Sequence, residues 1–187
     1  MNPSSPPDVL QNSERNIHIS RGLVADLLIS HHWKLATAES CTGGLIAACC
    51  TDIAGSSDWF ERGFVTYSNA AKTEMLGVNA ALIDSHGAVS EEVVRAMVQG
   101  ALQHSAAQVA VAVTGVAGPG GGSPSKPVGT VWLAWATPAG VVSEVQHFAG
   151  DRAQVRAATV QHALHRLATL LQAVDSQASG RQGVLRR

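Results

Sequence analysis

The most informative stretch of the chain reads VAVAVTGVAGPGGG, from Val109 to Gly122. Residues 109–113 are small or β-branched, which predicts a strand buried on both faces, as in a parallel sheet. The five glycines between 115 and 122 end this strand, because they suit neither a helix interior nor a strand interior. A glycine-rich loop that leaves a core strand exposes main-chain N–H groups, so this loop is a candidate anion-binding site.

Segments with strand and helix patterns alternate on both sides of this central strand. The pattern predicts strands over Trp33–Ala38 and Phe64–Tyr67, and a hairpin of Thr130–Ala136 and Val141–Phe148 around Pro138-Ala139-Gly140. It predicts helices around Leu23–Leu28, over Thr42–Asp52, over Asn69–Leu76 with Gly77 closing it, after Ser90, and from Asp151. This order predicts an α/β fold, a three-layer α/β/α sandwich with a mixed parallel and antiparallel sheet.

Length and composition limit the class of protein. The chain has 187 residues, 45% of them hydrophobic, which suits one domain with a substantial core. The 13 Lys and Arg residues nearly balance 14 Asp and Glu residues, which argues against a nucleic-acid binder. No run reaches the ~18 apolar residues of a membrane span. We expect one domain over residues 16–172, between a disordered N-terminal tail (1–15) and a flexible C-terminal tail (173–187).

Two further features favour a cytoplasmic location. The first sixteen residues contain three prolines and lack the basic and apolar regions of a secretory signal. The cysteines, Cys41, Cys49 and Cys50, are odd in number and lack metal-site spacing, so we expect reduced thiols.

The eight histidines also lack neighbouring ligands at suitable spacing, and we predict no metal site.

A candidate reactive segment, AESCTGG at 38–44, joins the first predicted strand to a helix. Ligands of α/β folds bind beyond the carboxyl ends of strands, and free N–H groups at a helix start suit an oxyanion or a phosphate. Ser40 is therefore a candidate nucleophile. The alternative is that Ser40 or Thr42 only caps the helix, and this segment alone favours the cap.

A second segment, VTYSNAAK at 65–72, brings Tyr67 to the end of a strand and Lys72 to the first turn of a helix. The positive end of a helix disfavours a cation, and burial would also favour neutral lysine. Neutral lysine is a known base for activating a serine hydroxyl without histidine. The alternative is an exposed lysine on a polar helix face.

The loop after Thr114 matches neither of two common nucleotide-binding motifs. Lys126 follows Ser123 and Pro124, so the GxxxxGK[ST] motif is absent. The residues after Gly115 do not fit GxGxxG, and no helix is expected to follow them. The alternative to an anion site is a flexible linker, although linkers rarely start directly from a core strand.

Together these segments resemble the CinA C-terminal domain family, whose standalone members are nicotinamide-nucleotide amidases. The resemblance spans about residues 17–172. The matching residues are 38–44, Tyr67-Ser68-Asn69 with Lys72, Leu76-Gly77-Val78, 114–121, 126–131 and Gly150-Asp151-Arg152. The chain lacks the larger N-terminal domain of full-length CinA proteins, so activities of that domain are not expected here.

The resemblance implies hydrolysis of nicotinamide mononucleotide to nicotinate mononucleotide and ammonia, in pyridine nucleotide recycling. It implies acyl transfer with Ser40 as nucleophile, Lys72 as general base and Tyr67 assisting, and it reverses the preference for a Ser40 cap. Main-chain N–H groups near Thr42 and Gly43 would hold the oxyanion. The expected substrate-binding residues are Glu39, Thr42, Gly43, Gly44, Asn69, Thr114, Gly115, Gly118, Pro119, Gly120 and Arg152.

No metal or organic cofactor is implied, and the expected partner is a small-molecule substrate rather than nucleic acid or membrane. The resemblance also implies a homo-oligomer, with a dimer as the candidate state. Arg152 is a candidate phosphate ligand, with a surface salt bridge as its alternative. Two other functions stay open, a non-catalytic nucleotide-binding or regulatory module and a serine amidohydrolase for a different amide.

Overall fold

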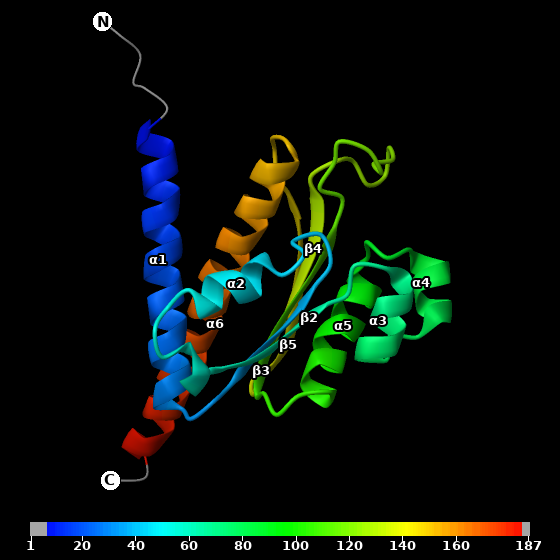
Figure 1. Ribbon diagram of the computed structural model, residues 1–187. Helices are drawn as coiled ribbons and strands as arrows, with labels where there is room; N and C mark the ends of the chain where they lie inside the picture. Colours follow the sequence, from blue (N-terminus) through cyan, green and yellow to red (C-terminus); the bar gives the residue numbers. More distant parts are fainter. Residues whose placement is uncertain (1–6, 185–187) are drawn as a thin grey trace, which may run out of the picture.

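Strand β3 lies in the middle of a sheet whose strand order is β2-β1-β3-β4-β5 (Figure 1). β1 pairs in parallel with β2 and β3, whereas β4 runs antiparallel to both β3 and β5, so the predicted mixed sheet is confirmed. The computed structural model describes residues 7–184. Its strands are β1 Leu35–Glu39, β2 Phe60–Val65, β3 Val109–Gly115, β4 Thr130–Thr137 and β5 Gly140–His147.

Helices cover both faces of the sheet, which confirms the three-layer α/β/α sandwich. α1, α2 and α6 lie on one face, and α3, α4 and α5 lie on the other (Figure 1). The helices are α1 Pro7–Ser30, α2 Leu45–Thr51, α3 Asn69–Leu76, α4 Ala80–His86, α5 Glu91–Gln103 and α6 Arg152–Val184, with a short 3-10 helix η1 at Ser56–Asp58.

The alternation of side chains along β3 divides the interior into two hydrophobic cores. Val109, Val111 and Val113 belong to the core that the sheet shares with α1, α2 and α6. Ala110 and Ala112 face the other way and belong to the core built with α3, α4 and α5. Successive residues of a strand point to opposite faces, so a strand buried on both sides needs apolar residues throughout.

The sheet brings the three candidate segments to one edge. Residues Leu35–Glu39 of β1 pair in register with Val109–Val113 of β3, and Glu39 also pairs with Val65 of β2. The three strands are parallel neighbours, so the chain leaves all of them at the same end. Segments 40–44, 66–72 and 114–122 therefore begin side by side.

The start of α2 differs from the prediction of a helix over Thr42–Asp52. Gly43 and Gly44 have φ angles of 62° and 98°, a left-handed conformation that continues the turn after β1. The helix therefore starts only at Leu45. Glycine adopts such angles without steric cost, and this places the turn where a helix was expected.

Other boundaries also differ, and α4 was not predicted. β2 begins at Phe60, four positions earlier than expected, because an edge strand tolerates polar residues that hide its pattern. α4 buries little besides Ile83, so its apolar period is weak. α1 begins at Pro7 and α6 continues to Val184, so both helices extend into the segments expected to be tails. Helices need no apolar stripe to continue, and proline is well placed at a helix start.

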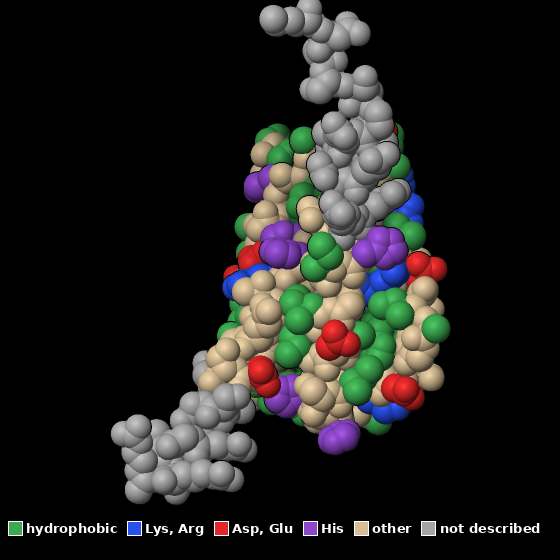
Figure 2. Space-filling view, turned by 90° about the vertical axis from the view of Figure 1, so that its left-hand side faces the viewer, with side chains coloured by type: hydrophobic (Ala, Val, Ile, Leu, Met, Phe, Trp, Pro, Cys, Tyr) green, Lys and Arg blue, Asp and Glu red, His purple; other side chains and the backbone are tan. Residues whose placement is uncertain are grey.

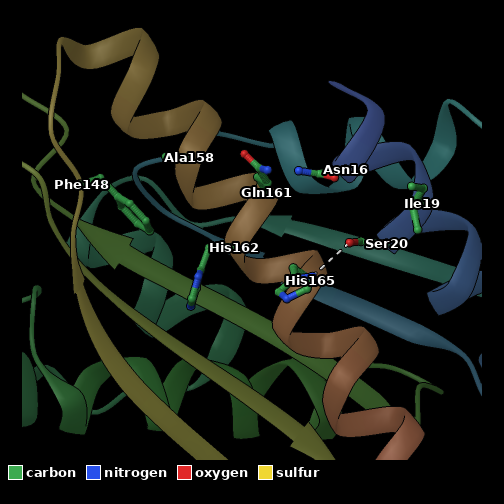
Figure 3. A pocket seen from close by; sticks show the side chains of 8 residues that line it. All are labelled: Asn16, Ile19, Ser20, Phe148, Ala158, Gln161, His162 and His165. Carbon is green, nitrogen blue, oxygen red and sulfur yellow. Dashed lines mark hydrogen bonds between the residues drawn. The ribbon is translucent and has the colours of Figure 1, made fainter. Parts of the chain in front are cut away.

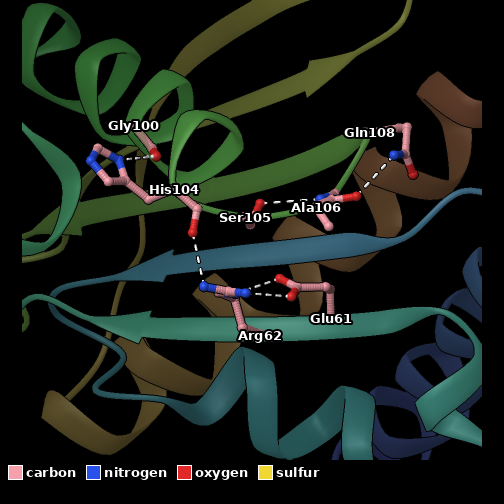
Figure 4. Close-up of polar contacts among 8 residues, drawn as sticks. Glu61, Arg62, Gly100, His104, Ser105, Ala106 and Gln108 are labelled. Atoms are coloured by element: carbon pink, nitrogen blue, oxygen red, sulfur yellow. Dashed lines mark hydrogen bonds and ion pairs between the residues drawn. The ribbon is translucent and has the colours of Figure 1, made fainter.

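Polar contacts tie the edge strand β2 to the end of α5 (Figure 4). Arg62 donates from Nη1 to the His104 carbonyl oxygen at 2.9 Å and pairs with the neighbouring Glu61. His104 in turn contacts the Gly100 carbonyl oxygen through Nδ1. These contacts lie at the opposite end of the strand from the candidate segments, so they support the sheet rather than the site.

The face that carries α1 shows mixed chemistry (Figure 2). Ile19 and Ile29 of α1 are exposed. Figure 2 shows hydrophobic side chains on this face interspersed with histidine and acidic side chains. In the part of the chain that is described, no helix combines the length and apolar character needed to cross a membrane.

Candidate active site

Ser40 occupies the turn that follows β1. Its N–H donates to the Val113 carbonyl oxygen at 3.1 Å, which continues the pairing with β3 by one residue. The Ser40 carbonyl oxygen accepts from the Gly43 N–H at 3.1 Å, so residues 40–43 form a tight turn. Ser40 is buried, so little of its side chain reaches the outer surface of the protein.

The Lys72 side chain lies against the Ser40 hydroxyl. Its Nζ is 3.1 Å from Ser40 Oγ, 2.9 Å from the Thr66 carbonyl oxygen and 3.5 Å from the Tyr67 carbonyl oxygen. Lys72 is only 1% exposed, and no carboxylate of the described residues forms an ion pair with it. Burial lowers the pKa of Lys72 below the ordinary lysine value, because water no longer stabilises the ammonium form.

The first turn of α3 directs Lys72 towards β1. Ser68 caps this helix by accepting a hydrogen bond from the Ala71 N–H at 3.0 Å, and Gly77 ends it with a left-handed φ of 68°. Both features match the predicted helix over Asn69–Leu76. Within this rigid turn, Lys72 points at Ser40, so a hydroxyl nucleophile and a base stand in contact.

Glu39 holds the turn that carries Ser40. Its Oε2 accepts from Thr42 Oγ1 at 2.6 Å and from the N–H groups of Gly44 and Ile46 at 3.0 Å each. Its Oε1 accepts from the Ala47 N–H at 2.8 Å, and Glu39 is fully buried. The carboxylate therefore serves as a cap for α2, where negative charge is favourable.

A pocket of about 190 Å³ opens on the Ser40–Lys72 pair. Its lining comes from all three loops at this edge of the sheet and from the start of α6. The lining residues are Ser40, Cys41, Tyr67, Asn69, Lys72, Ala88, Val89, Thr114, Gly115, Ala117 and Arg152. Thr114 also donates from Oγ1 to the Ala88 carbonyl oxygen at 2.8 Å, which fixes the segment before α5 against β3.

A larger pocket of about 680 Å³ adjoins the first. Ala117 and Arg152 line both pockets, so the two lie next to each other. The residues of the larger pocket are Ala117, Gly118, Pro119, Val128, Gly150, Asp151, Arg152, Ala153 and Arg156. The arrangement can hold a ligand whose reacting group lies at Ser40 while the rest extends past Arg152.

The protein-family model of the CinA C-terminal domain matches residues 19–171 of this chain. The chain belongs to this family. The predicted resemblance is thereby confirmed over nearly the whole described domain.

Relatives of known name cover most of the chain. A protein of Enterobacter agglomerans named nicotinamide-nucleotide amidohydrolase PncC is 52% identical over 85% of this chain and 96% of its own length. A PncC protein of Pseudomonas putida is 60% identical over 73% of this chain and 86% of its own. A crystal structure of the competence/damage inducible protein CihA from Agrobacterium tumefaciens covers 83% of this chain and 94% of that one, with 46% identity and a TM-score of 0.79.

In this CinA-type domain the expected site residues divide into three groups. Seven of them line the pocket at the Ser40–Lys72 pair, namely Ser40, Lys72, Tyr67, Asn69, Thr114, Gly115 and Arg152. Gly118 and Pro119 line the adjoining pocket. Glu39, Thr42, Gly43, Gly44 and Gly120 line neither, and the carboxylate of Glu39 is already occupied by donors of the chain itself.

The Tyr67 hydroxyl contacts Arg152, another residue of the pocket lining. Tyr67 is 61% exposed, and its hydroxyl oxygen accepts a hydrogen bond from Arg152 Nη2 at 2.9 Å. Only the main-chain carbonyl of Tyr67 approaches Lys72. The burial of Lys72 therefore comes from the surrounding turns, and the phenol positions Arg152 at the pocket mouth.

Arg156 is a pocket residue that the sequence analysis did not identify. It donates from Nη2 to the Thr42 carbonyl oxygen at 2.9 Å, across 114 positions of sequence. The spacing of four between Arg152 and Arg156 places both on one face of α6. That spacing was visible in the sequence, but any exposed helix face can show it.

A separate cavity of about 460 Å³ lies between α1 and α6, and none of the candidate catalytic residues lines it (Figure 3). Its lining includes His162 and His165 of α6 and Ser20 of α1. Among the side chains that the structure describes, residues 16–176, no three His, Cys, Asp or Glu side chains gather as a metal-binding group.

Cys41 adjoins the proposed nucleophile, and we expect Cys41→Ala to keep most of the activity. Burial raises the pKa of the Cys41 thiol to about 11, so the sulfur is protonated near neutral pH and is a poor nucleophile. We expect kcat within about threefold of the wild-type value, since an inert buried thiol contributes packing only. Ammonia release by both proteins, with and without a thiol-specific reagent, checks this. Inactivation of the wild type but not of Cys41→Ala would contradict it.

Proposed function

We propose that this protein hydrolyses the carboxamide of nicotinamide mononucleotide, giving nicotinate mononucleotide and ammonia, as a step of pyridine nucleotide recycling. The observation that carries the proposal is the 3.1 Å contact between Ser40 Oγ and the buried Lys72 Nζ. The names of the PncC relatives support the substrate. The cytoplasmic location and the homo-oligomer stay predictions.

The first half of the reaction forms an acyl enzyme. Neutral Lys72 takes the hydroxyl proton of Ser40 while Oγ bonds to the carboxamide carbon. The tetrahedral intermediate then collapses, its C–N bond breaks, and the Lys72 ammonium returns the proton to the leaving nitrogen. Ammonia departs, and nicotinate stays bound to Ser40 as an ester.

The second half releases the product. Water attacks the ester carbon while Lys72 accepts one of its protons, and the Ser40 oxygen leaves with a proton from Lys72. The products are nicotinate mononucleotide and the free enzyme. Lys72 carries the proton in both halves, so its neutral form is needed at the start of each.

The oxyanion needs N–H donors that the turn does not already use. The N–H of Gly43 is bonded to Ser40 and that of Gly44 to Glu39, so these two are taken. The N–H groups of Cys41 and Thr42 donate to no carbonyl oxygen of the described residues. We assign the oxyanion to these two amides, which shifts the expected position back by one residue.

An ammonia-release assay tests this function with three compounds, namely nicotinamide mononucleotide, nicotinamide and NAD. We expect turnover of the mononucleotide, with nicotinamide a poor substrate because it lacks the groups that fill the larger pocket. Turnover of another amide alone would indicate a different amidohydrolase. Binding of the mononucleotide without ammonia release would indicate a non-catalytic module, and either result would refute the proposal.

A further inference from the structure

Two arginines of α6 lie in the larger pocket without a charged partner. Arg152 donates to the Gly118 carbonyl oxygen and the Tyr67 hydroxyl, and Arg156 donates to the Thr42 carbonyl oxygen, each at 2.9 Å. All these acceptors are uncharged. Among the described residues, neither guanidinium forms an ion pair with a carboxylate, although most other arginines here do.

The local electrostatics disfavour two cations at this place. Arg152 and Arg156 are four residues apart on α6, a spacing at which like charges repel. Both lie within the first turns of this long helix, whose N-terminal end is itself positive. The one acid of the pocket, Asp151, accepts from the Gln154 N–H at 2.9 Å and so caps the helix.

Arg156 also has unused hydrogen-bonding capacity. Its Nε is buried and has no hydrogen-bond partner; the same is true of Nε in Arg21 and Arg166, but those two side chains are paired with carboxylates. A buried donor without an acceptor costs free energy, and a charged donor costs more than a neutral one. An anion bound in this pocket would supply the missing negative charge, and an anion oxygen that reached Nε would also supply the missing acceptor.

The position of this pair fits the far end of a substrate. The pocket of Arg156 adjoins the pocket of Ser40, and Arg152 and Ala117 line both. Figure 1 shows the first turn of α6 at the same end of the sheet as the loop between β3 and β4. A ligand with its carboxamide at Ser40 would therefore carry its anionic group towards the two guanidinium groups.

We propose that Arg156, together with Arg152, forms the subsite for the phosphate monoester of the substrate, and that Arg156 makes the enzyme select a mononucleotide over the nucleoside. This rests on the proposed function. Guanidinium groups suit phosphate because their planar N–H pairs match two of its oxygens. The glycine loops were expected to bind the phosphate. In this proposal they shape the pocket, and the positive charge that binds the phosphate comes from the two arginines of α6.

The test compares Arg156→Gln with the wild type on nicotinamide mononucleotide and on nicotinamide riboside. Glutamine removes the charge, and its amide nitrogen ends two bonds short of the Nη2 that donates to the Thr42 carbonyl oxygen, so the riboside measures what the loss of that contact costs by itself. We expect kcat/KM for the mononucleotide to fall about 10- to 100-fold, the usual effect of losing a hydrogen bond to a charged group. The value for the riboside should change far less, and Arg156→Lys should recover part of the loss.

Arg166→Gln is the matched control, because Arg166 lies on the same helix and pairs with Glu144 outside the pocket. It should leave both substrates unaffected. An equal loss on both substrates in Arg156→Gln would assign Arg156 to support of the turn and overturn the proposal, and so would no loss on either.

A binding measurement separates this inference from the proposed function. Calorimetric titration with nicotinate mononucleotide should show weaker binding to Arg156→Gln than to the wild type, whether or not ammonia is released. If the wild type binds this nucleotide but releases no ammonia, the proposed function fails and the subsite stands. Equal affinity of the two proteins would overturn the subsite.

Discussion

Replacing Lys72 by methionine should lower kcat for ammonia release by about 10²- to 10⁴-fold, the usual contribution of a general base. Lys72 Nζ lies 3.1 Å from Ser40 Oγ, and no histidine lines this pocket to take its place. Methionine keeps much of the stem volume, so the buried site should stay filled. KM should change less, because Lys72 acts on the reacting atoms and the arginines hold the far end of the substrate.

Lys72→Arg should fail as well, because arginine does not lose its proton in this pH range. Circular dichroism and thermal unfolding check that both variants fold. Near-normal turnover by the arginine variant would show that positive charge suffices and that proton transfer by Lys72 is not needed.

The pH dependence of the wild type follows from the same residue. Only neutral Lys72 can accept the Ser40 proton, so the rate should rise with pH through one ionisation and then level off. Because burial lowers the pKa of Lys72, the plateau should begin below the pH at which an ordinary lysine loses its proton. The carbonyl oxygens of Thr66 and Tyr67 act against this effect of burial, because they accept hydrogen bonds from Lys72 Nζ and so stabilise its ammonium form.

The fold could be predicted from the sequence where a residue pattern is typical of only one type of secondary structure. The β-branched and small residues of 109–113 gave a buried strand, and the hairpin around Pro138 and Ala139 was visible from its turn. The start of α2 was not predictable, because Gly43 and Gly44 fit either a helix start or a left-handed turn. Glu39 favours the left-handed turn over the helix start, because in this turn its carboxylate accepts a hydrogen bond from the Gly44 N–H.

The separate segments of the site could be predicted from the sequence, but the contacts between these segments could not. The segment of Ser40 and the segment of Lys72 were each identified, and the parallel register of β1, β2 and β3 explains why they meet. The direction of a side chain depends on distant neighbours, and no local pattern marks the hydrogen bond between Arg152 and the Tyr67 hydroxyl. Arg156 reaches Thr42 from the far end of the chain, and no local pattern marks that contact.

Glu39 shows how a residue outside the pocket can control the site, and its replacement by alanine should destabilise the protein by about 3–5 kcal/mol. The change removes the acceptor of four hydrogen bonds, among them those from the buried Ile46 N–H and Thr42 hydroxyl. A buried donor without a partner costs about 1–3 kcal/mol, and donors that are only half-buried can turn to water at less cost.

Glu39→Gln should lose only part of this stability, since an amide oxygen in place of Oε2 can accept the same three bonds while its NH₂ group faces the Ala47 N–H. Chemical denaturation of Glu39→Ala, Glu39→Gln and the control Glu74→Ala measures these differences. Glu74 is an exposed acid on α3, and its replacement should change stability by no more than about 0.5 kcal/mol. Because Glu39 fixes the turn that carries Ser40, kcat of Glu39→Gln should fall more than its affinity for nicotinate mononucleotide. A Glu39→Ala protein as stable as Glu74→Ala would show that the turn holds itself.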